Sequence, residues 1–199
     1  LRFEFYYQTR QRVFIIALVI FALMGIGYGL NVAVTPDSFA NSAYNLTYAV
    51  ANMSLLATFF VALLCGNAAL RDSNAKITEL VGATPVSPIK LCASRYISFV
   101  SLSLVIFVSG IAALALGFLL RDTGTDVIGP FVLSHYFWPL LTYGLPNILL
   151  VSAVVFFGAT VTRSQGMTFL SGVLLFVLYF VGSLVFDSPS MAGSQPLSD

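Results

Sequence analysis

Charged residues are scarce in this chain, and their scarcity excludes an ordinary soluble domain. Only 9% of the 199 residues are charged, whereas 58% are hydrophobic. A soluble domain usually carries about 25% charged residues. The mean hydropathy is +0.94, so the composition indicates a membrane protein.

The residue types of most catalytic and metal sites are also few. Cys65 and Cys92 lack the spacing of a disulfide framework or a metal site, so we interpret both as packing residues. The lone His135 stands beside Tyr136 and Trp138, as an interfacial residue would. The sequence has no HExxH, GxSxG or phosphate-binding GxxxxGKS/T motif. We therefore expect no catalytic residue, and no metal or cofactor bound by this chain.

Apolar residues, by contrast, form five runs that are long enough to cross a bilayer as helices. About 20 apolar residues span a hydrocarbon core of roughly 30 Å. The runs predict spans at about 13–31, 47–70, 88–120, 137–162 and 167–186. We expect an all-α fold: a polytopic transmembrane helix bundle that forms one domain over residues 1–199.

The later spans carry specific boundary signals. Ser87 followed by Pro88 predicts the start of the third helix. A helix of this length is about 50 Å long, so its first turns should project from the membrane. Pro146 is expected to kink the fourth helix, and Gln165 with Gly166 to form the turn before the fifth.

A few polar residues and glycines lie inside the predicted spans. Asn52, Thr58 and Asn147 are candidates for helix packing or for a substrate pathway, and interhelical bonding is the commoner use of such residues. Gly25 and Gly29 form a GxxxG motif, which alone is weak evidence for a helix contact.

The basic residues are distributed unevenly between the two sides of the predicted bundle. Arg121 stands alone on one side, and eight residues fall on the other: Arg2, Arg10, Arg12, Arg71, Lys76, Lys90, Arg95 and Arg163. The positive-inside rule therefore predicts that the N-terminus and residues 71–96 are cytoplasmic. Five spans then place the C-terminal tail outside.

Residues 1–12 mix arginines with aromatic side chains. This combination beside a span is typical of a helix that lies in the membrane interface. A plain cluster of topogenic charges is the alternative interpretation.

Residues 71–90 form the longest interval without an apolar run. Ser73 or Asn74 can cap a short helix over residues 75–81, and Gly82 can end it. The helix would place Ile77, Leu80 and Val81 on one face, with Lys76 and Glu79 left polar. The pattern fits either a helix that rests on the membrane surface or one that docks a partner.

The stretch TELVGATPVSPIKLCASRY resembles the segment between the second and third membrane helices of type-2 ABC transporter permeases. In that family, this position holds the coupling helix, which seats in a groove of the ATPase subunit. The matching residues are Thr78, Glu79, Leu80, Thr84, Pro85, Val86 and Ser87. A glycine that the family often has before the threonine is replaced here by Ile77. The stretches FEFYYQTRQR and LPNILLVSAVVFFGATVTRS resemble the connecting helix and the fourth helix of the same family.

The resemblance implies the membrane-spanning permease subunit of an ATP-driven ABC exporter in the bacterial inner membrane. Such a chain is not an enzyme by itself, because ATP and Mg bind a separate ABC ATPase subunit. The implied ATPase-docking residues are Lys76, Ile77, Thr78, Glu79, Leu80, Val81, Thr84, Pro85, Val86 and Ser87. A second membrane half or a homodimer partner would complete the pathway within the lipid bilayer, and no nucleic-acid partner is expected. A non-transporting membrane anchor or assembly subunit is the alternative.

The family pattern has six spans per half, and only five can be counted here. We therefore expect that the domain is incomplete and that residues 187–199 begin an outer segment. The resemblance extends to long permeases that carry a second membrane half and a zinc aminopeptidase domain.

Overall fold

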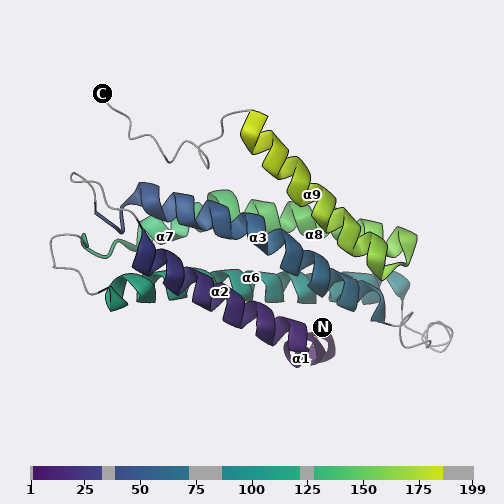
Figure 1. Ribbon diagram of the computed structural model, residues 1–199. Coiled ribbons are helices and arrows are strands. Elements are labelled where there is room, and N and C mark those ends of the chain that lie inside the picture. The colour runs from purple at the N-terminus through teal and green to yellow at the C-terminus, as the bar shows by residue number, and fades with distance from the viewer. Residues whose placement is uncertain (1, 33–38, 72–86, 122–127, 186–199) are drawn as a thin grey trace.

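The computed structural model describes residues 2–32, 39–71, 87–121 and 128–185, and all regular structure in them is helical. The all-α prediction is confirmed (Figure 1). The elements are α1 (Arg2–Thr9), α2 (Arg12–Asn31), α3 (Ala43–Ala69), α6 (Pro88–Leu120), α7 (Leu133–Pro139), the π-helical turn η1 (Leu140–Gly144), α8 (Leu145–Thr162) and α9 (Gln165–Val185).

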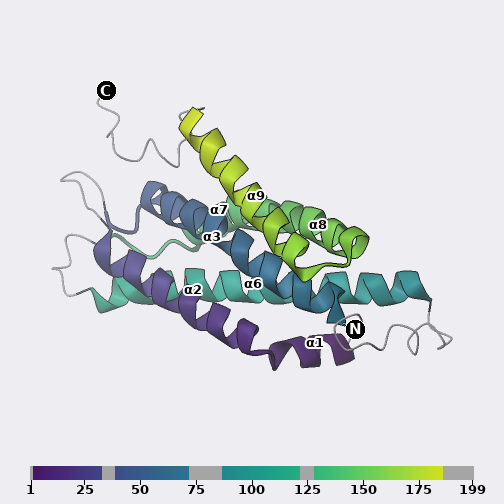
Figure 2. The same ribbon diagram turned by 45° about the vertical axis from the view of Figure 1, so that its right-hand side comes forward.

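Among the residues that the structure describes, four helical segments are long and apolar enough to cross a membrane. They are Arg12–Asn31, Ala43–Gly66, Ile89–Leu120 and Leu133–Thr162. The fifth predicted span corresponds to α9, which has 21 residues and in which Gln165–Val181 is an apolar helix. The helix is present, and its crossing of the membrane stays a prediction. The end of α9 diverges from the other helices in both views (Figure 2).

The predicted start of the third helix is confirmed, and the start of the second is corrected. Ser87 is the N-cap residue of α6, without a side-chain capping hydrogen bond, and Pro88 is the first residue of the helix. The second helix begins at Ala43, earlier than expected, because Ser42 caps it: the backbone N–H of Asn45 donates to Ser42 Oγ at 3.4 Å. A serine cap satisfies one of the free N–H groups at a helix start.

The fourth predicted span begins at Leu133 and contains η1, which ends two residues before Pro146. Proline cannot donate the i→i−4 hydrogen bond, so irregular backbone is expected in the preceding turn. The ring of Phe107 occupies the space that a side chain at Gly144 would need. The irregularity at Pro146 therefore takes the form of a wider turn, against which α6 packs an aromatic ring.

The expected turn at Gln165 and Gly166 is wrong. α8 ends at Thr162, and α9 already includes Gln165. Arg163 makes the turn with a left-handed φ of 50°, and its N–H donates to the carbonyl of Ala159 at 3.0 Å. Glycine is the usual residue in this conformation, so the glycine in the sequence was a misleading signal.

The long helices run between two ends of the bundle that differ in charge. One end carries α1, the start of α2, the end of α3, the start of α6 and the α8–α9 turn (Figure 1). We call it the basic end, because its described residues include Arg10, Arg12, Arg71, Lys90, Arg95 and Arg163. Arg121 lies at the opposite end, where its Nη1 donates to the carbonyl of Val32 at 2.9 Å.

Candidate functional site

The short helix α1 packs against the basic end with its polar side facing inward. Glu4 and Gln8, four residues apart and therefore on one face, are only 5% and 2% exposed. The aromatic residues Phe3 and Tyr6 are 67% and 56% exposed. This order is the reverse of an amphipathic helix on a water-soluble protein. It suits a helix whose outer face meets lipid, as the sequence predicted for residues 1–12.

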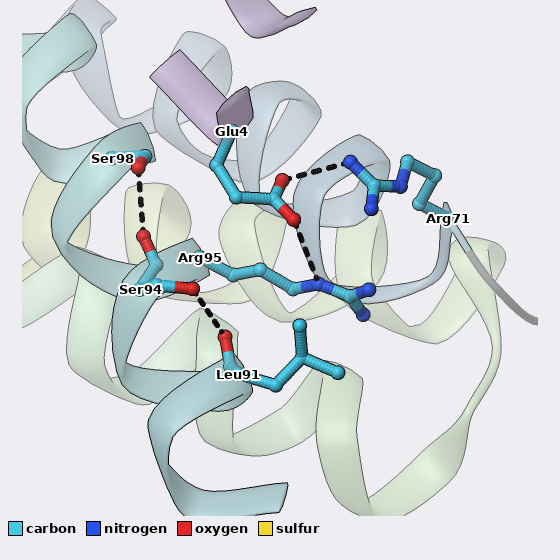
Figure 3. A network of polar contacts seen from close by, with 6 residues as sticks. All are labelled: Glu4, Arg71, Leu91, Ser94, Arg95 and Ser98. Carbon is cyan, nitrogen blue, oxygen red and sulfur yellow. Dashed lines mark hydrogen bonds and ion pairs between the residues drawn. The ribbon is translucent and has the colours of Figure 1, made fainter. Parts of the chain in front are cut away.

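Glu4 lies between two arginines from different helices (Figure 3). Its Oε2 accepts a hydrogen bond from Nη1 of Arg71, two residues after the end of α3, at 2.8 Å. Its Oε1 lies 3.7 Å from Nε of Arg95 on α6, a distance for ion pairing rather than hydrogen bonding. We call these three residues the Glu4 cluster. One carboxylate thus joins three helices at the basic end.

Aromatic rings of α1 complete the environment of Arg71. The guanidinium carbon of Arg71 lies 5.6 Å from the ring centre of Phe3 and 5.0 Å from that of Tyr7. Both distances are within the range of cation–π attraction. Arg71 therefore contacts α1 through its charge and through its flat face, which favours one orientation of the short helix.

Two members of the Glu4 cluster, Glu4 and Arg95, are buried, and Arg71 is partly exposed. A buried charge is costly to leave without a partner. Removal of the Glu4 carboxylate would remove the acidic group of α1 that both guanidinium groups contact, so Glu4 stabilises the seating of α1.

Nine of the ten predicted docking residues lie outside the described part of the chain. The nine are Lys76, Ile77, Thr78, Glu79, Leu80, Val81, Thr84, Pro85 and Val86. Ser87 is described and exposed, and it is the N-cap residue of α6. Arg71 immediately precedes residues 72–86, and Arg95 lies in the second turn of the helix that follows them. The Glu4 carboxylate therefore contacts residues on both sides of the predicted docking stretch.

The three polar candidates inside the spans have different surroundings. Nδ2 of Asn147 donates to the carbonyl of Ser54 at 2.9 Å and so joins α8 to α3. Nδ2 of Asn52 donates to Tyr48 of its own helix at 2.9 Å. Thr58 is buried. The Asn147 bond is the kind that a packing role requires, and a pathway role for these residues stays a prediction.

The sequence interpretation did not identify the Glu4 cluster. The distribution of basic residues explains its arginines only as topology signals, and Glu4 has no predicted role. A usable signal was present: Glu4 is the only acid in residues 1–12, and Gln8 follows it at helical spacing. Two polar residues on one face of an otherwise aromatic helix indicate an inward polar face.

The packing interpretation of the cysteines holds only in part, because Cys65 is buried but Cys92 is exposed. The described residues contain no group of three or more His, Cys, Asp or Glu that could hold a metal ion. Comparisons with protein-family models, with curated proteins and with solved structures give no match to the chain.

Proposed function

We propose that the chain is the membrane-spanning permease subunit of an ATP-driven ABC exporter, in a bacterial inner membrane with its N-terminus cytoplasmic. The observation that carries this proposal is the resemblance of residues 78–87 to a coupling helix, at the expected place between the second and third spans. The apolar helices support a membrane protein in general. The partner, the direction of transport and the type of membrane belong to the proposal.

The length of α6 supports a role in transmitting motion. Its 33 residues correspond to about 50 Å, longer than a hydrocarbon core of roughly 30 Å. The helix begins directly after the proposed docking stretch, so a displacement there acts on its first turn. A continuous helix transmits such a displacement to the middle of the bundle.

The contacts of α6 identify what would move with it. Gly110 and Gly117 of α6 lie against the backbone of α2, and Tyr96 is within 3.2 Å of the Ser152 hydroxyl on α8. In the proposed mechanism, closure of two ATP-bound ATPase subunits displaces the short helix at residues 75–81. α6 then shifts the helices packed on it, and a second membrane half completes the pathway.

The docking stretch can be tested by two substitutions on its predicted helix. Glu79→Arg reverses a charge that would set the docking register, and Leu80→Asp places a charge on the predicted apolar face. Mismatched charge at an interface is strongly unfavourable. We expect both variants to insert normally but to lose copurification with the ATPase subunit, or its stimulation. The measurement is pull-down and ATP turnover in proteoliposomes.

The matched control is Asp122→Arg, the same change of charge in the predicted outer loop, which should leave ATP turnover unchanged. Normal association and turnover in both docking variants would contradict the proposed interface. A copurifying ATPase that the membrane chain does not stimulate would favour the alternative, a membrane anchor or assembly subunit.

A further inference from the structure

Gln8, the second inward polar residue of α1, is buried without a hydrogen bond to its side chain among the described residues. It is only 2% exposed, and neither Nε2 nor Oε1 has a hydrogen-bond partner among the residues that the structure describes. A buried donor or acceptor without a partner lowers stability, and such groups are rare enough in folded proteins to require an explanation. The seat of α1 therefore contains one favourable polar contact, at Glu4, and one unfavourable one, at Gln8.

The connection between α1 and α2 permits α1 to move as a unit. Only Arg10 and Gln11 separate the two helices. Gln11 has an extended backbone, with φ −70° and ψ 138°, and its side chain does not cap α2. A few residues at the end of an element commonly absorb the rotation in hinged movements. An eight-residue helix is also too short to be stable on its own, so its environment decides where it lies.

The outer face of α1 fits a second position without the Glu4 contacts. Phe3, Phe5, Tyr6 and Tyr7 are exposed, and the guanidinium of Arg10 lies 4.7 Å from the ring centre of Tyr6. Aromatic rings and arginines are favourable at the level of lipid headgroups. In that layer the Gln8 amide would find water and headgroup oxygens as partners.

We propose that α1 is a strap with two positions on the basic end of the bundle. In the seated position, which is the one described here, Glu4 pairs with Arg71 and Arg95 while Gln8 has no partner. In the released position, α1 has turned about Arg10 and Gln11 and lies in the membrane interface with Gln8 solvated. Glu4 favours the seated position and Gln8 opposes it.

The strap has a mechanical consequence that rests on the proposed function. Arg71 and Arg95 lie on either side of the proposed docking stretch, and α1 continues into α2. Movement of the docking stretch would disturb the Glu4 contacts and change the position of α1. The equilibrium of the strap itself can be measured on this chain without any ATPase, so the two proposals can fail separately.

The test uses spin labels on the full chain in lipid nanodiscs. Phe5→Cys and Ile89→Cys place labels on exposed positions of α1 and α6, with Cys65 and Cys92 replaced by alanine. Double electron–electron resonance then reports the distance between the helices. We expect two distance populations in this otherwise unchanged chain. A single population would overturn the strap.

Two substitutions should move the populations in opposite directions. Glu4→Gln removes the charge that holds the seat, and we expect the released-to-seated ratio to rise about tenfold, since a buried ion pair is strongly destabilised by loss of one partner. Gln8→Met removes the unpaired amide at similar volume, and the ratio should fall about tenfold, as expected for relief of an unsatisfied buried group.

Arg163→Gln is the matched control, because it removes one exposed charge of the basic end without touching the Glu4 cluster or the α1–α2 connection, and it should leave the ratio unchanged. A rise of the ratio with Gln8→Met, or equal effects of Glu4→Gln and Arg163→Gln, would overturn the proposal. If Glu4→Gln does not fold, the labelled chain with and without Gln8→Met still decides it.

Discussion

At the scale of single residues, the polar side chains inside these apolar helices mostly form hydrogen bonds within their own helix. The hydroxyls of Ser54 and Ser103 donate to carbonyls of their own helices, at 2.8 and 2.9 Å. Short hydroxyl side chains can reach the preceding turn, so a serine or threonine in a span does not by itself mark a helix contact. Asn147 differs because its bond crosses from one helix to another.

Asn147→Leu should lower the free energy of unfolding by about 1 kcal/mol, the usual scale of an interhelical hydrogen bond in a membrane protein. Unfolding of the purified chain by SDS in mixed micelles measures this. The control is Asn52→Leu. The Asn52 amide bonds within its own helix, so this change should lower the free energy of unfolding by less. Equal losses in the two variants would contradict the assignment of Asn147 as a helix-packing residue.

At the scale of elements, the contact between α2 and α6 depends on glycines from both helices. A Cβ atom on Gly25 would overlap the carbonyl oxygen of Gly110, and one on Gly29 would lie 2.7 Å from the Cα of Gly117. The backbones meet because these positions lack side chains, as small residues allow in membrane helices. The GxxxG motif of α2 is therefore a real contact within this chain, although its spacing alone was weak evidence.

Gly25→Ala should separate α2 from α6 and lower the free energy of unfolding by roughly 1–3 kcal/mol, the usual cost of overpacking. Gly27→Ala is the control on the same helix, because a Cβ there meets nothing within 4 Å. That change should be neutral or stabilise by up to about 1 kcal/mol, since alanine favours helix. Thermal unfolding in one detergent compares the two. If Gly27→Ala lowered the free energy of unfolding as much as Gly25→Ala, the close approach of α2 and α6 would be contradicted.

At the scale of the whole molecule, charge distinguishes the two ends of an otherwise apolar bundle. The basic end includes Lys90 at the exposed start of α6, whereas Phe131 is exposed near the opposite end, just before α7. The excess of basic residues predicts that the end with Lys90 faces the cytoplasm.

Cysteines introduced as Lys90→Cys and Phe131→Cys, after replacement of Cys65 and Cys92, should label from opposite sides of the membrane. An impermeant maleimide should modify only the Phe131→Cys protein in intact cells, and the Lys90→Cys protein only after permeabilisation. Labelling of Lys90→Cys in intact cells would reverse the orientation, and the cytoplasmic docking interpretation would be lost with it.

The sequence by itself determined the helices and most of their limits. Long apolar runs must satisfy their backbone internally in a bilayer, which leaves helix as the natural form. Ser87 and Pro88 indicated the start of α6 through local chemistry alone. One error arose where two local signals competed. The turn between α8 and α9 was predicted at Gly166 because glycine favours turns, but Arg163 takes the left-handed conformation.

Only the tertiary structure decided which distant residues meet. Glu4 and Arg71 are 67 positions apart, and Asn147 and Ser54 are 93 apart. No periodicity in one sequence relates such positions, because their contact depends on how the helices are arranged around one another. The partners that Glu4 meets and the unpaired amide of Gln8 likewise follow from where α1 packs. Local sequence sets which residues share a helix face, whereas packing sets what that face meets.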